Sequence, residues 1–178
     1  MVGKYTGLSD SYLSVIKALQ HSALAVNRKL VIDWIESTNL DPIDKTRAYD
    51  DAWATLRAAD GILVPGGFGD RGIEGKILAA HHARTENVPY LGICLGLQIA
   101  TIEFCRNVLG MTGANSTEFE DNPEHAAVVF MPEISKTHLG GTMRLGSRPT
   151  LWHHEGSIIR TLYGPGEAVD ELSLIHIS

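Results

Sequence analysis

The sequence predicts an α/β fold with a largely parallel sheet, on three observations. Short aliphatic segments alternate along the chain with segments whose apolar residues recur every three or four positions. Glycine-rich loops follow two of the predicted strands. The 178 residues are 44% hydrophobic and 20% charged, the balance of an ordinary globular domain with a core of its own. Right-handed crossovers between parallel strands would place helices on both faces of this sheet.

Each element has a local justification. The opening "VGKYT" is typical of a strand, and Ser9 and Asp10 supply N-cap chemistry for an amphipathic helix over about 12–24. Further strands are predicted at 29–35, 61–65 and 88–93, and helices near 46–59, 74–84 and 97–109. Beyond residue 110 the pattern weakens: "NSTEFED" fits a loop, "AAVVFM" a strand, and "GGTMRLG" a turn into another strand.

Composition excludes several classes of function. The net charge is −6 and the acidic residues are scattered, so no basic stripe is present to follow nucleic acid. No apolar run approaches the roughly 18 residues of a membrane span, and the first ten residues lack the apolar core of a signal peptide. Two cysteines are too few for a disulfide framework, which favours the reducing cytoplasm.

The first glycine-rich loop, "PGGFGDRG" (65–72), leaves two readings open. It matches the dinucleotide-binding pattern G-x-G-x-x-G, but that pattern also needs an acidic residue about 20 positions further on. The next predicted strand ends instead in Gly92, Ile93 and Cys94. The loop could also be a tight turn whose glycines serve only backbone geometry.

The second loop, Gly92-Ile-Cys94-Leu-Gly96, has the form of a nucleophile elbow with cysteine in place of serine. The flanking glycines make room for a sharp strand-to-helix turn, and the helix N-terminus stabilises a thiolate. In an elbow, one oxyanion donor is the N–H of the next residue, here Leu95, and the loop Gly66-Gly67-Phe68 is a natural source of the other. Each loop therefore explains the other. Cys105, within an apolar helical segment, is expected in the core.

The remaining motifs carry no separate site. No cluster of His, Cys, Asp and Glu has zinc-site spacing, so no metal is predicted. His153 and Glu155 share an H-x-E spacing, but a surface histidine pair at a helix start is the better interpretation.

Taken together, "VPGGFGDRG", "PYLGICLGLQIA", "RNVLG", "ANSTEF" and "GGTMRLG" resemble the glutamine amidotransferase domain of the CTP synthase family, from about residue 2 to about residue 171. G-x-C-x-G alone would indicate only the class I amidotransferases, and "ANSTEF" with "GGTMRLG" narrows the match. The resemblance implies a flavodoxin-like α/β architecture. It also implies a Cys-His-Glu triad that hydrolyses glutamine to glutamate through a thioester. The ammonia would pass to a synthetase domain, where ATP-activated UTP is aminated to CTP.

Carried over by motif, the resemblance assigns roles to single residues. Cys94 matches the nucleophile, and Gly67 and Leu95 match the oxyanion donors. Glu118 matches the carboxylate that contacts the amino group of the substrate. The residues that match the glutamine-binding segments are Gly67, Leu95, Gly96, Leu97, Gln98 and Glu118. The resemblance further implies no cofactor in this domain, ATP and Mg in the synthetase domain, GTP as activator, CTP as inhibitor, and a cytoplasmic homotetramer.

The chain also departs from the family pattern. The synthetase domain would precede residue 1, and the first strand looks clipped. After Glu171 the resemblance is lost, so residues 1–171 are predicted to be a partial amidotransferase domain and 172–178 ("LSLIHIS") a non-native tail. The triad His and Glu have no counterpart, so we expect the chain alone to hydrolyse glutamine poorly or not at all. We also expect exposed strand edges and association.

Three alternative functions stay open. The chain could be another class I cysteine amidotransferase or hydrolase with a different ammonia acceptor. It could be a dinucleotide-binding module that uses "GFGDRG". It could also be a non-catalytic remnant that binds a partner.

Overall fold

The computed structural model describes residues 1–4, 7, 9–43, 46–67, 69–129, 146–154 and 156–173. The chain divides into two compact units, Met1–Val129 and Phe130–Ser178. Each unit is described by itself.

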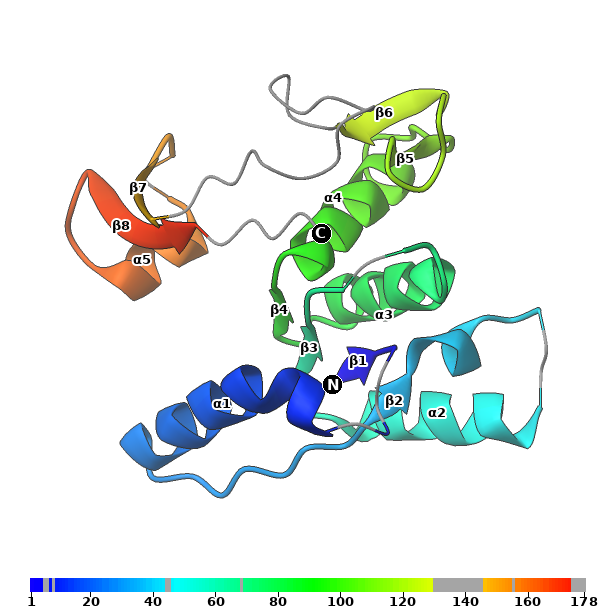
Figure 1. The fold of residues 1–178 in the computed structure, drawn as a ribbon, viewed down its shortest axis with the longest axis horizontal. Helices are drawn as coiled ribbons and strands as arrows, with labels where there is room; N and C mark the ends of the chain where they lie inside the picture. The colour runs from blue at the N-terminus through cyan, green and yellow to red at the C-terminus, as the bar shows by residue number, and fades with distance from the viewer. Residues whose placement is uncertain are drawn as a thin grey trace. The chain divides into compact units, whose positions relative to one another are not determined.

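Strands and helices alternate through unit 1 (Figure 1). Its strands are β1 (Val2–Gly3), β2 (Ile35–Glu36), β3 (Ile62–Val64), β4 (Tyr90–Gly92), β5 (Ala114–Ser116) and β6 (His125–Val128). Its α-helices are α1 (Leu13–Ala25), α2 (Arg47–Ala58), α3 (Ile73–Thr85) and α4 (Leu95–Asn107), and its 3-10 turns are η1 (Ser9–Tyr12) and η2 (Ser37–Leu40). In unit 2 the described elements are β7 (Gly146–Leu151), α5 (Ile158–Tyr163) and β8 (Ala168–Ser173).

Pairing among the described strands is mostly parallel. Within unit 1, β1 pairs with β2, β3 with β4 and β5 with β6, all in parallel. Only β7 and β8, in unit 2, are antiparallel. The register of the central pair sets Val64 opposite Gly92, so the loops that follow β3 and β4 leave the sheet at the same edge. The predicted α/β class with mostly parallel pairing is confirmed, with the described strands arranged as two-stranded sheets.

Two hydrophobic clusters hold unit 1 together. The first joins the strands β1, β2 and β3 to helices α2 and α3, with Val2, Leu40, Leu56 and Val64 almost inaccessible. The second lies between α3 and α4 and is centred on Ile99 and Ile102. Helices α3 and α4 directly follow the two glycine-rich loops, so the second cluster fixes the loops through their helices.

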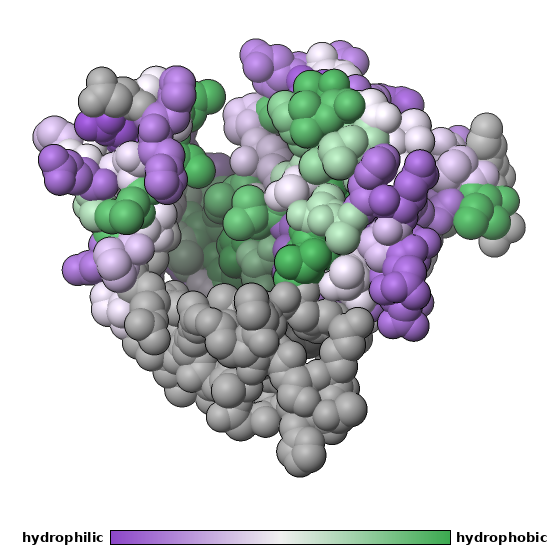
Figure 2. Space-filling view, turned by 90° about the horizontal axis from the view of Figure 1, so that it is seen from above, coloured by the Kyte–Doolittle hydropathy of each residue, from purple (hydrophilic) through white to green (hydrophobic). Residues whose placement is uncertain are grey.

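Apolar side chains also reach solvent. Figure 2 shows hydrophobic residues, in green, among hydrophilic ones, in purple, on the face it presents. On β4, on α4 and on the two residues between them, the large exposed apolar side chains are Leu91, Ile93, Leu97 and Phe104. Helix α1 buries none of its residues.

Three expectations about single elements were wrong. The strand predicted at 29–35 is reduced to Ile35–Glu36, because only the short strand β1 lies opposite it. Tyr12, without a side-chain hydrogen bond, is the N-cap of α1, since the 3-10 turn η1 occupies the positions of Ser9 and Asp10. The segment expected to be a loop at "NSTEFED" begins inside β5, which is paired with β6.

Other expectations agree or lie outside the described residues. The helices and strands predicted between residues 46 and 109 are confirmed, with ends shifted by a few residues. "AAVVFM" contributes to β6. "GGTMRLG" falls outside the described residues except for Gly146, the first residue of β7. Of the predicted tail, Leu172 and Ser173 end strand β8, and 174–178 are not described.

Candidate active site

Cys94 lies on a sharp turn between β4 and α4. Its backbone has φ 54° and ψ −107°, and its side chain is exposed. A positive φ is costly for a residue with a Cβ and persists only where the surroundings impose it. This is the conformation of a nucleophile elbow, in which the strained turn pushes the reactive side chain out of the sheet.

Glycines on both sides are required by close packing of backbone. A Cβ at Gly92 would lie 2.5 Å from the carbonyl carbon and oxygen of Gly96. A Cβ at Gly96 would overlap the carbonyl oxygen of Val64 on the neighbouring strand. The turn can therefore be this tight only because neither position has a side chain.

The loop after β3 runs directly beside the elbow. The Ile93 N–H donates to the Val64 carbonyl at 3.0 Å, which extends the β3–β4 ladder to the residue before the cysteine. A Cβ built on Gly66 would be 3.3 Å from the Cys94 Cβ and 3.7 Å from its Sγ. A Cβ on Gly67 would be 3.6 Å from the Leu95 Cδ2. The structure thus brings together the two loops that the sequence linked; Phe68 lies outside the described residues.

Leu95 provides a backbone donor beside the sulfur. It is the first residue of α4, and the N–H of a first helical residue has no acceptor within its own helix. Its side chain is buried between α3 and α4, which fixes the direction of that N–H. The positive end of the helix dipole lies at the same place.

The side chain of Tyr90 stabilises the first turn of α4. Its hydroxyl donates to the Gly96 carbonyl at 2.8 Å. Burial, assisted by the charge of Glu103, raises the pKa of Tyr90 well above its usual range. The phenol therefore stays protonated and donates this bond throughout the neutral range.

Gln98 presents an unused acceptor one turn into α4. Its backbone N–H donates to the Cys94 carbonyl at 3.2 Å, so Gln98 belongs to the first turn after the elbow. The Oε1 atom is buried and has no hydrogen-bond partner among the described residues. A buried acceptor without a donor costs free energy, so the site suits a ligand that carries an N–H group. Leu97, predicted in the same segment, is 63% exposed.

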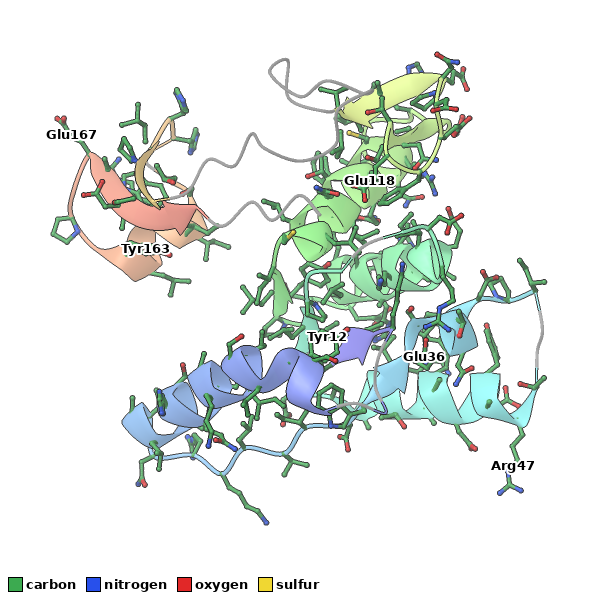
Figure 3. The ribbon with its side chains drawn as sticks, viewed as in Figure 1. Tyr12, Glu36, Arg47, Glu118, Tyr163 and Glu167 are labelled. Atoms are coloured by element: carbon green, nitrogen blue, oxygen red, sulfur yellow. The ribbon has the colours of Figure 1, made fainter. Side chains whose placement is uncertain are left out.

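Glu118 is exposed on the turn that follows β5, beside helix α4 (Figure 3). Its N–H donates to the Ser116 Oγ at 3.2 Å, and the Phe119 N–H donates to the Ser116 carbonyl at 3.0 Å. The carboxylate interacts electrostatically with Lys4, whose ammonium donates to the Gly69 carbonyl at 2.6 Å. Lys4 therefore connects the carboxylate of Glu118 electrostatically to the glycine loop at Gly69.

Sequence reasoning missed three charged side chains that surround these segments. Lys76 of α3 is only 2% exposed. Glu103 of α4, 3% exposed, receives a bidentate bond from Arg84 and bonds from His81 and Asn107. Arg106 connects α4 to α3 and β5. A single charged residue within a helical pattern gives no signal of burial, so nothing in the sequence could have identified them.

Other predicted features stay apart from this site or undescribed. His153 and His154 are exposed in unit 2, five and four residues before α5 begins, and Glu155 lies outside the described residues. Cys105 is half-buried rather than in the core. Among the residues that the structure describes, no group of three or more His, Cys, Asp or Glu could hold a metal ion. No helix in this described part is long and apolar enough to cross a membrane.

The fold and the elbow define a class: an α/β protein in which a sharp strand–helix turn exposes a cysteine beside a glycine-rich loop and the first backbone N–H of a helix. The glutamine amidotransferase class-I family model matches residues 7–174. The chain belongs to the class-I glutamine amidotransferase family.

Comparison with individual relatives shows which class-I amidotransferases the chain resembles. The chain is 59% identical over 176 residues to a CTP synthase of Dictyostelium discoideum, an alignment that covers 96% of this chain and 31% of the relative. It is 54% identical over 174 residues to CTP synthase 1 of Homo sapiens, with 96% and 29% covered. A solved glutaminase domain of Trypanosoma brucei CTPS with bound acivicin superposes with a TM-score of 0.84 at 38% identity, covering 96% of this chain and 63% of that one. The chain thus spans about a third of the length of the curated relatives it matches.

These comparisons decide between the alternatives left by the sequence. They favour a CTP synthase glutaminase domain over a dinucleotide-binding module, since "GFGDRG" lies inside the matched amidotransferase region.

Proposed function

We propose that Cys94 is the nucleophile with which this domain hydrolyses the side-chain amide of glutamine, as part of a CTP synthase. The observation that carries the proposal is the elbow itself. Cys94 is held at positive φ between two obligatory glycines, beside the glycine loop after β3 and the first backbone N–H of α4. Its exposed sulfur leaves room for a substrate.

The proposed chemistry follows from this geometry. The Cys94 sulfur attacks the carboxamide carbon, and the N–H groups of Leu95 and Gly67 stabilise the negative charge that develops on the carbonyl oxygen. The C–N bond breaks, and the nitrogen leaves as ammonia after taking up, through solvent, the proton that the Cys94 thiol gave up, so that a thioester remains. Water then cleaves the thioester, which releases glutamate and restores the thiol.

Two further groups would orient the substrate. Glu118 supplies a carboxylate for the ammonium of the amino acid, and charge-assisted bonds of this kind are stronger than neutral ones. The orphaned Oε1 of Gln98 would accept an N–H of the substrate. Gly96 and Leu97 complete the wall of the pocket with backbone and an exposed apolar side chain.

The wider assignment rests on the relatives. Ammonia from this domain would pass to a synthetase domain that uses ATP and Mg to aminate UTP to CTP. We further propose that this domain itself carries no cofactor, that GTP activates hydrolysis and CTP inhibits the full enzyme, and that the full enzyme is a cytoplasmic homotetramer.

Glutamate release from saturating glutamine tests the proposal, with Cys94→Ser and Cys105→Ser as a matched pair of variants. The proposal predicts that Cys94→Ser abolishes whatever glutamate release the chain supports, while Cys105→Ser retains it. Measurable release from the parent chain that continues undiminished in the Cys94→Ser variant would contradict the assignment of the nucleophile.

A further inference from the structure

Arg106, in the last turn of α4, joins three elements through one guanidinium group. Its Nε donates to the carbonyl of Ala114, the first residue of β5, at 2.7 Å. Its Nη1 donates to both carboxylate oxygens of Glu74, in the first turn of α3, at 3.0 and 3.1 Å. Helix α3 follows the glycine loop and α4 follows the elbow, while β5 leads to Glu118. Each segment of the proposed site is therefore connected to Arg106.

The environment of these contacts favours a fixed geometry. The Arg106 side chain is 19% exposed and Ala114 is fully buried. A guanidinium is a rigid planar fork, so the part-buried Nε bond to the Ala114 carbonyl sets its plane, and the contact to Glu74, whose side chain is 55% exposed, adds a second point in that plane. Lysine could satisfy one of these partners at a time but not both in this arrangement.

Arg106 is too far from the sulfur to touch the substrate of Cys94. Twelve residues of helix separate the two, which corresponds to about 18 Å along the axis. The path to the site runs through β5 instead. Ala114 begins this strand, Ser116 ends it, and the hydroxyl and carbonyl of Ser116 fix the turn that carries Glu118.

We propose that Arg106 is a positioning residue that sets the carboxylate of Glu118 relative to Cys94 and thereby determines affinity for the α-amino group of the substrate. This inference rests on the proposed function. Arg106 acts through β5, so its loss weakens recognition of the amino acid and leaves the reactivity of the sulfur unchanged.

Two electrophiles separate these effects in the 178-residue chain. Acivicin is an α-amino acid. The rate at which it labels Cys94, measured at several acivicin concentrations, gives an inactivation constant KI and a limiting rate. Iodoacetamide carries no α-amino acid group and reports on the sulfur alone. For Arg106→Met we expect KI to rise about tenfold, the effect of losing one charge-assisted contact, with the limiting rate and the iodoacetamide rate within about twofold of the parent. Arg106→Lys, which keeps the charge and one contact, should recover part of the loss.

A double-mutant cycle with Glu118→Gln tests whether Arg106 affects substrate affinity through Glu118. If Arg106 acts through Glu118, Arg106→Met should add little to the KI of Glu118→Gln. Arg47→Met is the control, since the Arg47 side chain is 95% exposed on α2. The KI of this variant for acivicin should equal that of the parent chain.

The possible results distinguish the two levels of inference. An unchanged KI in Arg106→Met, additive effects in the cycle, or an equal fall in both labelling rates would overturn the role of Arg106 while leaving the proposed function intact. If the rate at which acivicin labels the parent chain rises with concentration without saturating, the α-amino acid site is overturned, and the role of Arg106 with it.

Discussion

Lys76 provides a quantitative prediction from burial alone. Its ammonium group sits within unit 1 with 2% of the residue exposed, near Lys4 and Arg71 and with Glu36 as the opposing charge. Burial first, then the charge of Lys4 and, more weakly, of Arg71, lower its pKa from 10.5 to about 8, although Glu36 counteracts part of this. At about 1.4 kcal/mol for each pKa unit, the folded state pays about 3 kcal/mol to keep this lysine charged.

The pH dependence follows from that sign. Below about pH 8 both folded and unfolded chains hold the proton, so the whole penalty is present. Between about 8 and 10.5 the unfolded chain binds more protons than the folded one, and stability contributed by this group rises with pH. Lys76→Met removes the group and keeps an unbranched apolar side chain. The variant should be more stable than the parent by about 3 kcal/mol at most at pH 7 and by less than about 1 kcal/mol at pH 10.

Urea unfolding of both proteins at several pH values between 7 and 10 measures this difference. Lys17→Met, on the exposed face of α1, is the matched control and should show a small difference that does not depend on pH. A stability difference between Lys76→Met and the parent that stays constant from pH 7 to 10 would refute the reasoning. It would mean that the folded protein accommodates the charged ammonium without penalty.

Two other substitutions test the elbow and the ion network. Gly96→Ala should cost about 3 kcal/mol of unfolding free energy, because its Cβ would overlap the Val64 carbonyl oxygen. Gly61→Ala is the control and should cost little, since its Cβ would be 3.6 Å from the nearest atom. Equal losses of stability for the two variants in denaturant unfolding would contradict the packing argument. Glu103→Gln should cost about 1 kcal/mol at pH 7, because the hydrogen bonds of Glu103 lose their charged acceptor while Arg84, whose side chain is 35% exposed, can turn to solvent; the exposed Glu86→Gln should cost almost nothing. Burial raises the pKa of Glu103, but the hydrogen bonds from Arg84, His81 and Asn107 outweigh it, so the pKa is lowered overall. The stability lost in Glu103→Gln should therefore persist through pH 5 and disappear only as the pH falls through that lowered pKa. A stability difference that stays constant down to pH 2 would contradict this reasoning.

The sequence was sufficient for the elbow because glycine spacing reports directly on backbone geometry. Gly92 and Gly96 flank a position where only a strained turn needs both, and the structure gives Cys94 the positive φ that this requires. The helices between residues 46 and 109 were predictable for a similar reason, since their apolar periodicity reflects packing against the sheet.

Elements that depend on distant partners were not predictable. The aliphatic run 29–35 has strand propensity throughout, but a strand exists only where a neighbour lies alongside, and β1 offers that neighbour only at Ile35 and Glu36. In the same way, β5 forms because β6 pairs with it, although its sequence is rich in residues typical of loops.

Buried charges were the other failure. Lys76, Glu103 and Arg106 occupy ordinary positions in helical patterns, and their partners come from other elements or from one helix turn away. The roles assigned to Gly67, Leu95, Gln98 and Glu118 stay predictions, as do the division at residue 171 and the non-native character of 172–178.

The central claim is that Cys94 is the nucleophile of a site that recognises glutamine. Peptide mapping after brief exposure to acivicin, with and without excess glutamine, tests it most directly, because the chain has only two cysteines. The account predicts a label on Cys94 that glutamine suppresses and little or no label on Cys105. Preferential labelling of Cys105, or labelling of Cys94 that glutamine does not slow, would contradict it.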